Sequence, residues 1–438
     1  HLARLGYRVT IFEALPKPGG MLRYGIPEYR LPRKILDSEI NWIKRFGVEI
    51  RTNVRVGTDI SLSDMRRGHD ALFIAVGAHR GSSLGIEGEG MAGVMQGIDF
   101  LRSVNMKEKV TIGQHVAVIG GGNTAIDCAR TVKRLGAGNV TIIYRRSRAE
   151  MPALPEDVDA IGQEGIKLEL LAAPKRLLRE EGRLSGVECV RVQLGPPDES
   201  GRPRPVPIQG SQFVIPVDMV IAAVGQSPDL GFTKDLGIGI SKQGVIEIEP
   251  QTAATDVEGV FAGGDGAGVK AYVADAIASG KRAALGIFCY LEGKDAREEL
   301  RRHQIGDGSS FSFHHFMNSE TYKVDLKNIV PYEKINTLCF SHLDRTENPE
   351  LLKPKRRTRG FREVIGGIEP SRMASEIGRC FKCGTCTHCD LCFLLCPDIS
   401  IRKSGTDGYT VKTDYCKGCS ICASSCPRNV IDIIGGGR

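Results

Sequence analysis

Ten of the 14 cysteines in this 438-residue chain lie between Cys380 and Cys426. Eight of them form two runs with the same spacing, Cys-x2-Cys-x2-Cys-x3-Cys-Pro: Cys386, Cys389, Cys392 and Cys396, then Cys416, Cys419, Cys422 and Cys426. Thiolates spaced in this way bind [4Fe–4S] clusters. The spacing therefore predicts two such clusters in a small ferredoxin-like α+β domain.

In paired runs the fourth cysteine binds the cluster of the other run. We therefore expect one cluster on Cys386, Cys389, Cys392 and Cys426, and the other on Cys416, Cys419, Cys422 and Cys396. Zinc is disfavoured, because zinc ribbons do not duplicate a four-cysteine run ending in Cys-Pro. The same spacing disfavours a disulfide framework, and a cluster protein is expected in a reducing cytoplasm.

The remaining cysteines are less informative. Cys380 and Cys383 are either surplus thiols, which we favour, or ligands of a cluster that a preceding part of the protein completes. Such a part is expected, because the chain begins without Met and in the middle of a pattern, "HLARLGYRVTIFE". The four scattered cysteines are expected to be buried core thiols: Cys128, Cys189, Cys289 and Cys339.

Length and charge set outer bounds. A chain of 438 residues is too long for one ordinary core, so two or more domains are expected. The net charge of +7 suits anionic ligands or an acidic partner and does not indicate a nucleic-acid binder. No apolar run reaches about 18 residues, so no membrane span is predicted.

A dinucleotide-binding turn is predicted within "HVAVIGGGNTAIDCARTVKRLGAGNVTIIYRR" (115–146), which reads as strand, Gly turn, helix and strand. Gly120 permits the tight turn, Gly122 lets backbone approach a pyrophosphate, and Ala125 allows close helix packing. The helix start then offers free N–H groups to phosphates. Asn123 and Thr124 complete the predicted site. A Gly-rich turn without a ligand is the weaker alternative.

The second strand of this unit ends in two arginines where an NAD site usually carries an acid. Arg145 and Arg146 offer cations and forked donors to a 2′-phosphate, which favours NADPH over NADH. The alternative is two exposed arginines at a strand end.

A flavin site is predicted from scattered residues. Glu13 ends the strand "YRVTIFE" where a ribose-binding acid belongs, so its Gly-rich turn would precede His1. Asp265 follows a strand in "FAGGDG" and opens a helix that could face the flavin. Small or flexible residues near these points are assigned to the same site: Gly19, Gly20, Met21, Gly25, Ala75, Gly77 and Gly264.

Three further segments carry structural predictions. Residues 31–47 are predicted to form an amphipathic helix with Leu36, Ile40 and Ile43 on one face. The Pro- and Gly-rich residues 195–210 are predicted to form a surface hairpin loop. The basic run 353–362 is interpreted as a solvated loop or, less favoured, as a docking surface for an acidic partner.

Three stretches, "GGMLRYGIPEYRLP", "GGGNTAIDCARTVKRLGAGNVTIIYRRSRAEMPA" and "GVFAGGDG", resemble the small subunit of glutamate synthase and its relatives over about residues 1–290. The cysteine tail is absent from that subunit. It resembles a subfamily that feeds electrons to other complexes, such as 2-oxoacid, aldehyde and sulfite-reductase-associated oxidoreductases. Members also carry an N-terminal iron–sulfur domain, which is not in this chain.

The resemblance implies an α/β fold of two Rossmann-like domains, with the NADP domain inserted in the FAD domain. The expected parts are FAD domain 1–113, NAD(P)H domain 114–226, FAD domain 227–295, linker or docking region 296–375 and ferredoxin domain 376–438.

The function expected is an NADPH:acceptor oxidoreductase subunit that passes electrons through FAD and two clusters. The acceptor would be the catalytic subunits of a larger complex or a soluble ferredoxin, and the complex a hetero-oligomer. No side chain is assigned as catalytic, because the cofactors carry the chemistry. Alternatives are a true glutamate synthase small subunit and a non-enzymatic iron–sulfur relay or assembly subunit.

Overall fold

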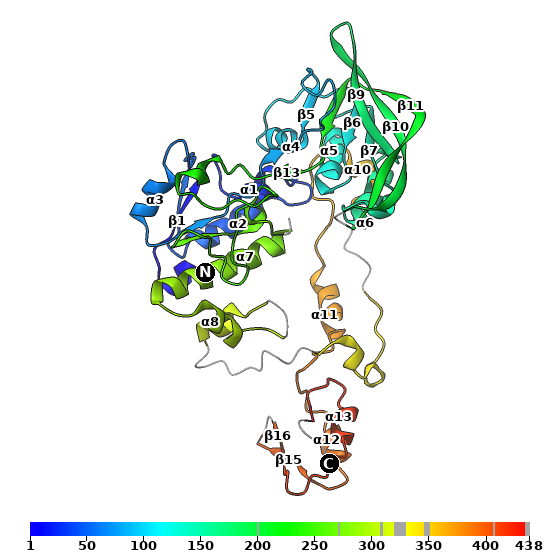
Figure 1. Ribbon diagram of the computed structural model, residues 1–438. Coiled ribbons are helices and arrows are strands. Elements are labelled where there is room, and N and C mark those ends of the chain that lie inside the picture. The colour runs from blue at the N-terminus through cyan, green and yellow to red at the C-terminus, as the bar shows by residue number, and fades with distance from the viewer. Residues whose placement is uncertain are drawn as a thin grey trace. The chain divides into compact units, whose positions relative to one another are not determined.

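A computed structural model describes residues 1–198, 201–269, 272–306, 310–318, 330–345, 351–405 and 408–433 (Figure 1). The chain divides into two units. Unit 1 is His1–Ala296 with Glu350–Gly366, and unit 2 is Arg297–Pro349 with Gly367–Arg438. The expected linker 296–375 is thus divided between the units, and its residues 307–309, 319–329 and 346–350 lie outside the described residues.

The centre of unit 1 is a five-stranded parallel sheet with the order β5-β12-β6-β7-β8. Its strands are β5 (Val94–Gln96), β12 (Met219–Ala222), β6 (His115–Ile119), β7 (Asn139–Tyr144) and β8 (Lys167–Leu170). Parallel sheets are covered on both faces, so their strands read as continuous apolar runs. The sequence HVAVI of β6 follows this rule, and its last four residues are buried.

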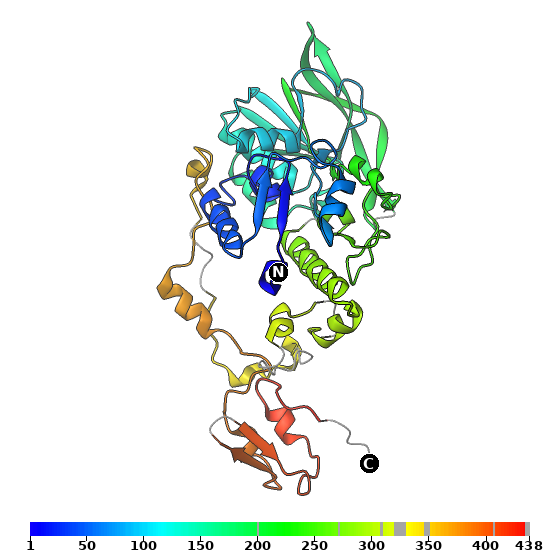
Figure 2. The ribbon, with the colours of Figure 1, turned by 90° about the vertical axis from the view of Figure 1, so that its left-hand side faces the viewer.

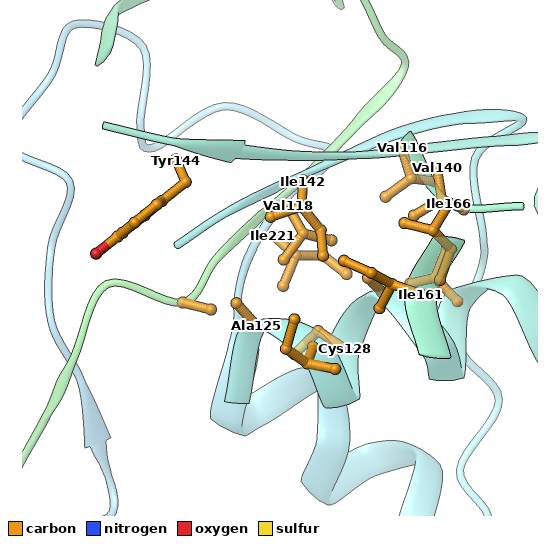
Figure 3. Close-up of a cluster of buried hydrophobic side chains, with 14 of the residues drawn as sticks. Val116, Val118, Ala125, Cys128, Val140, Ile142, Tyr144, Ile161, Ile166 and Ile221 are labelled. Atoms are coloured by element: carbon orange, nitrogen blue, oxygen red, sulfur yellow. The ribbon is translucent and has the colours of Figure 1, made fainter. Parts of the chain in front are cut away.

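Alternate residues of these strands enter two different cores. Val118, Ile142 and Ile221 pack with Ala125 and Cys128 against α5 (Asn123–Arg134) and α6 (Pro155–Gln163) (Figure 3). The intervening residues, such as Ala117 and Ile143, face the opposite core. That core is closed by an antiparallel ribbon of β9 (Ala172–Glu180), β10 (Arg183–Pro197) and β11 (Pro203–Pro216).

The ribbon corrects the prediction for residues 195–210. Strand β10 continues to Pro197 and β11 resumes at Pro203, so most of the expected loop is strand. β11 is an edge strand, where proline is tolerated because an outward N–H is not needed. Its prolines at 203, 205 and 207 are two residues apart, which places their missing donors on the same side of the strand.

The parts of unit 1 that flank this sheet and ribbon in the sequence contain two separate parallel pairs, and we call these parts the flavin half because the sequence predicts FAD there. β1 (Thr10–Glu13) pairs with β2 (Glu49–Thr52), as Figure 2 shows, and β3 (Leu72–Ile74) pairs with β14 (Val260–Ala262). Ile11 on β1 and Phe73 on β3 stay 42% and 38% exposed. These pairs therefore lack the two-sided cover of the five-stranded sheet.

The predicted amphipathic helix is α2 (Arg33–Lys44). Leu36, Ile40 and Ile43 share one face of this helix by their spacing. Leu36 is buried and Ile40 is partly buried, whereas Ile43 is 42% exposed, so only part of that face is covered. Among the scattered cysteines, Cys128, Cys189 and Cys289 are buried as expected. Cys339 is exposed, because its short helical turn at Thr337–Cys339 has no buried residue.

Shorter elements complete the fold. The helices of unit 1 not yet named are α1 (Gly20–Tyr24), α3 (Leu62–Gly68), α4 (Gly97–Asn105), α7 (Val273–Glu292) and α10 (Pro354–Arg357). The strands β4 (Arg80–Gly81) and β13 (Gln226–Ser227) form an antiparallel pair. α8 (Ala296–Arg302) follows α7, and α9 (Phe313–Asn318) and α11 (Pro370–Gly378) belong to unit 2.

The cysteine-rich end of unit 2 is an α+β arrangement. Two one-turn helices, α12 (Leu391–Leu394) and α13 (Ile421–Ser425), each lie within one cysteine run and contact one another. An antiparallel hairpin of β15 (Ile401–Ser404) and β16 (Gly408–Val411) separates the two runs in the chain.

A buried ionic junction ties the flavin half of unit 1 to the part built on the five-stranded sheet, which we call the inserted domain after its predicted place in the chain. The carboxylate of Glu164 pairs with Arg130 at 2.9 Å and with Arg134 at 2.6 Å, and its side chain is fully buried. The Arg134 guanidinium lies 3.9 Å from the ring centre of Tyr29 in the flavin half. The neighbouring Arg30 pairs with Asp127 of α5 at 3.0 Å.

The basic run joins the same junction. Arg357 is only 5% exposed and donates to the Gln163 side chain at 2.9 Å, while the Val364 amide donates to the Tyr29 carbonyl at 3.0 Å. The interpretation of a wholly solvated loop is therefore wrong at Arg357. The other cations of the run remain exposed: Lys353, Lys355, Arg356, Arg359 and Arg362.

Removing the central carboxylate of this junction should lower the free energy of unfolding of unit 1. Glu164→Ala leaves two buried guanidinium groups without their partner, and breaking a buried pair costs about 3–5 kcal/mol. We expect a loss of that size in urea denaturation followed by circular dichroism. Glu156→Ala, an exposed acid of the same helix, is the control and should change stability by less than about 0.5 kcal/mol. Equal effects of both substitutions would contradict this account.

Candidate functional site

The glycine turn after β6 is shaped by contacts that exclude side chains. Gly120 has φ of +144°, and a Cβ there would collide with the Ala223 carbonyl oxygen. A Cβ on Gly121 would lie 2.5 Å from the Tyr144 ring. Ala125 on the first turn of α5 is fully buried. The small residues are therefore required for the strand-to-helix connection itself.

Gly122 differs from its neighbours because space remains in front of it. A Cβ there would meet only Pro152, at 3.8 Å, and no side chain caps the first N–H groups of α5. Asn123 accepts a hydrogen bond from the Leu154 amide, and Thr124 accepts one from Gln226, both at 3.3 Å. An uncapped helix start beside an open glycine suits a dinucleotide pyrophosphate.

Arg145 and Arg146, both predicted to bind a 2′-phosphate, differ in the structure: one is exposed and the other is buried. Arg146 is 2% exposed, donates to the Pro203 carbonyl at 2.7 Å and pairs with Asp198 at 2.6 Å. It therefore holds the turn of the β10–β11 ribbon. Arg145 is exposed at the end of β7. Of the two, Arg145 has its guanidinium at the surface, where a 2′-phosphate could reach it.

The flavin half places Glu13 at the carboxyl end of β1. One carboxylate oxygen accepts from the Leu15 amide at 2.9 Å, and burial raises the pKa of this carboxyl. Gly20 begins α1 with φ of +49°, and a Cβ added to it would have no neighbour within 4 Å. Gly19 is packed against Leu36, and Gly25 is packed against Met21. Gly19, Met21 and Gly25 therefore shape the loop rather than line an open surface.

The loops after β3 and β14 lie side by side, because both strands are parallel. A Cβ on Gly266 would be 3.7 Å from the Gly77 carbonyl oxygen, which brings the 75–77 loop to the GGD turn. Gly264 has φ of +67°, and its amide donates to Ser279 at 3.1 Å. Asp265 is half-buried, and burial raises its pKa. It lies in a 3-10 turn, Gly264–Ala267, rather than at the start of α7.

The two cysteine runs are copies in conformation as well as in sequence. The residue after each second cysteine is left-handed: Asp390 has φ of +62° and Ser420 +65°. So is the third residue after each fourth cysteine, Ile399 at +52° and Asn429 at +49°. Such values are uncommon without glycine, so their recurrence marks one repeated loop.

The repeat extends to sulfur contacts. The amide four residues after the last cysteine of each run donates to that sulfur: Ser400 to Cys396 and Val430 to Cys426, both at 3.4 Å. Donors of this kind stabilise a thiolate, and the Ser400 hydroxyl beside Cys396 lowers the pKa of its thiol. Thiolate is the form that binds iron.

Crossed contacts connect the runs. Asp398 follows the fourth cysteine of the first run and pairs with Lys417 in the first loop of the second, at 3.3 Å. Arg428, at the equivalent position of the second run, donates to Thr387 in the first loop of the first run at 2.7 Å. Each fourth cysteine is thereby held near the opposite run. Asp398 and Arg428 occupy equivalent positions of a 30-residue repeat, and this repeat is the sequence signal from which the two contacts could have been predicted.

The thiols that act electrostatically on Cys392 are those of the crossed assignment. Burial raises the pKa of Cys392, and the thiols that raise it further are Cys389, Cys386 and Cys426. For Cys422, burial acts together with Cys416 and Cys419. These neighbours suit a four-iron cube, which needs thiolates on several sides rather than around a single ion.

Two observations concern the described residues as a whole. Their side chains include no set of three or more His, Cys, Asp or Glu gathered tightly enough for a single metal ion. None of their helices has the length and apolar character needed to cross a lipid bilayer.

Comparisons with protein families cover most of the chain. The family "Pyridine nucleotide-disulphide oxidoreductase" matches residues 1–280, and "4Fe-4S binding domain" matches residues 409–432, which include the second cysteine run.

Curated relatives match across both units. The beta subunit of NADP(+)-dependent formate dehydrogenase from Moorella thermoacetica is 43% identical over 87% of this chain and 52% of its own. The beta subunit of NADPH-Fe(3+) oxidoreductase from Geobacter sulfurreducens is 39% identical over 87% of this chain and 59% of its own. The chain thus spans between half and three-fifths of these relatives. A glutamate synthase [NADPH] small chain from Azospirillum brasilense is 34% identical over 66% of this chain and 63% of its own.

Among solved structures, FprA from Mycobacterium tuberculosis in complex with NADPH aligns with a TM-score of 0.54 at 17% identity. The alignment covers 72% of this chain and 82% of FprA. At this identity the likeness concerns the fold, which is the expected pair of nucleotide-binding domains.

Arg145 should determine the preference for the phosphorylated nucleotide. If its guanidinium contacts the 2′-phosphate, Arg145→Ala should weaken NADPH binding by about 1–3 kcal/mol, which is roughly 5- to 150-fold, and barely affect NADH. The measurement is kcat/KM for both nucleotides with a dye acceptor. Arg146→Ala is the control, since it should disturb the ribbon turn and affect both nucleotides alike. An Arg145 variant that loses both equally would rule out the contact.

The crossed assignment makes Cys426 a ligand of the cluster that lies far from it in sequence. Cys426→Ser should damage the cluster of Cys386, Cys389 and Cys392, and leave the cluster of Cys416, Cys419 and Cys422 in place. Anaerobic EPR of the reduced protein, compared with Cys386→Ser and Cys416→Ser, tests this. If the Cys426→Ser spectrum resembles that of Cys416→Ser, the crossed assignment fails.

Proposed function

Since the chain belongs to the pyridine nucleotide-disulphide oxidoreductase family, we propose that it is part of an NADPH:acceptor oxidoreductase subunit. It passes electrons from NADPH through FAD and two [4Fe–4S] clusters to a partner redox enzyme or a ferredoxin, and the reverse direction is chemically allowed. The observation that carries the proposal is one chain with both an open dinucleotide turn and a duplicated thiolate module.

The order of cofactors follows from electron count. A bound flavin accepts two electrons as hydride and releases them singly, which is how iron–sulfur clusters take them up. The chain's own part is to bind and orient these groups. No acid or base side chain is assigned to the reaction.

The NADPH residues occupy the inserted domain, which we place at 114–226. Gly120 and Ala125 fix the turn, and Gly122 with the uncapped start of α5 faces the pyrophosphate. Asn123 and Thr124 hold the turn against residues 154 and 226. Arg145 contacts the 2′-phosphate, and Arg146 supports it indirectly by anchoring the ribbon turn.

The FAD residues lie in the flanking parts, which we place at 1–113 and 227–295. Glu13 accepts from a ribose hydroxyl, and Gly20 leaves room for the ligand beside it. Asp265 and the Gly77 loop lie together at the carboxyl ends of β14 and β3. Burial raises the pKa of Asp265, so a hydrogen bond donated by a ligand hydroxyl stabilises its ionised carboxylate.

The partner is proposed from the names of the relatives. Two of them are beta subunits of larger enzymes, so we infer a hetero-oligomer with a catalytic subunit. The alternative of a glutamate synthase small subunit has some support from 34% identity, but that relative covers only 66% of this chain. A flavin absorption spectrum of the purified protein distinguishes the proposed oxidoreductase, which binds FAD, from the non-enzymatic relay or assembly subunit, which does not. Identification of the subunits that co-purify discriminates between the two partners.

Loss of the clusters should interrupt the path only after the flavin. With Cys389→Ser and Cys419→Ser combined in the full chain, NADPH should still reduce a two-electron dye, because the hydride site lies in the other unit. Reduction of ferredoxin should collapse. Ser424→Ala is the control and should retain both activities. If the double variant keeps its FAD but is no longer reduced by NADPH in stopped flow, the proposed order of cofactors is wrong.

A further inference from the structure

Unit 2 carries more exposed thiols than two clusters need. Beyond the eight of the two runs, Cys339, Cys380 and Cys383 are all exposed, whereas the three cysteines of unit 1 are buried. Exposed thiols are open to oxidation and are therefore uncommon without a task. These three need an explanation other than packing.

The loop from Cys380 to Cys383 has the backbone of a ligand loop. In both cluster runs the second cysteine of the first Cys-x2-Cys pair has a left-handed residue on each side. The pairs are His388 and Asp390 at +55° and +62°, and Gly418 and Ser420 at +68° and +65°. Cys383 is flanked in the same way, by Lys382 at +50° and Gly384 at +68°. A third loop therefore has the conformation of the two that are expected to bind clusters.

A second segment of unit 2 offers a matching pair. Residues 339–342 read Cys-Phe-Ser-His, and residues 380–383 read Cys-Phe-Lys-Cys. The phenylalanines, at the same position of each, have ring centroids 4.7 Å apart. Arg428 clamps both, because its guanidinium lies 4.8 Å from the Phe340 ring centre and donates to the Phe381 carbonyl. The two rings, tilted by 58°, hold two potential ligand loops against one another.

The side chains that these loops carry form a known type of ligand set. Three thiolates and one imidazole, in pairs separated by two residues, suit a tetrahedral structural zinc site. Thiolates favour zinc over magnesium or calcium. Zinc is not redox-active, so such a site would lie outside the electron path.

We propose that Cys339, His342, Cys380 and Cys383 bind a single thiophilic divalent cation, zinc foremost, which fastens the 330–345 segment to the cysteine module. As placed, the four side chains do not converge on one point. All four are exposed, so turning them inward breaks no buried contact. The pair that His342 makes with Asp344 joins side chains 90% and 98% exposed, and exposed pairs contribute little.

Binding of the metal ion would draw the four side chains together. A structural ion contributes its binding energy to folding when its ligands come together only around it. The inference goes beyond the proposed function, since it concerns how the chain is held together rather than what it oxidises.

The test is metal content of the full chain. The protein is first reconstituted anaerobically with iron and sulfide, then given zinc and desalted, and iron and zinc are counted by mass spectrometry. We expect about one zinc per chain in addition to about eight iron atoms. Cys380→Ser, Cys383→Ser and Cys339→Ser should lose zinc and keep iron, so iron content reports that each variant is folded.

Matched variants sharpen the result. His342→Ala should lower zinc retention and His342→Cys should restore it, whereas Ser341→Ala, between two ligands, should change neither metal. Cys416→Ser should lose iron and keep zinc. Full iron without zinc, or zinc unaffected by Cys380→Ser, would overturn the proposal. So would about four extra iron atoms that Cys380→Ser removes, which would indicate a third cluster. Failure of NADPH oxidation would leave zinc content unchanged, so the two proposals can fail separately.

Discussion

The buried carboxylate of Glu164 is the point on which unit 1 depends. Two arginines of α5 pair with it, and the Tyr29 ring of the flavin half lies against both of them. Arg357 of the basic run packs alongside, on Gln163. Charges this deep are tolerated only when each has its partner. Four segments that are distant in sequence therefore share one electrostatic requirement. The arrangement also explains why residues 350–366 belong to unit 1 although the chain on either side of them does not.

The two halves of unit 1 differ in how fully their sheets are covered by other residues. The five-stranded sheet of the inserted domain has apolar cores on both faces, so its glycine turn is held by packing that no ligand needs to complete. The flavin half has two short parallel pairs, and apolar side chains such as Ile11 and Phe73 are still partly exposed. The loops after β3 and β14 lie side by side, because these two strands are parallel and paired.

How much the sequence predicts depends on the range of the interactions involved. The glycine turn and the spacing of the cysteine runs depend on residues close together in the chain, and Gly120 has the left-handed φ that a tight turn needs. The repeated left-handed positions of the cysteine runs were not predicted from the sequence. Arg146 could not be assigned from its neighbours, because its partner Asp198 lies 52 residues away across a ribbon. The ribbon was itself hidden, since proline suggests a loop unless the strand is known to be an edge. The prediction that Cys339 is buried was wrong for a related reason. A thiol side chain is buried only if other residues cover it, and a sequence pattern does not show which residues do so.

The crossed contacts of Asp398 with Lys417 and of Arg428 with Thr387 have a consequence for how the module is made. If each cluster takes its fourth thiolate from the opposite run, the second cluster lacks a ligand until Cys422 is synthesised and the first until Cys426. Cluster insertion must then wait for translation of both runs, and a nascent chain stalled between them would present open thiols to whatever metal is at hand. The two cluster sites would therefore become complete almost together, although the first run is synthesised some 30 residues earlier.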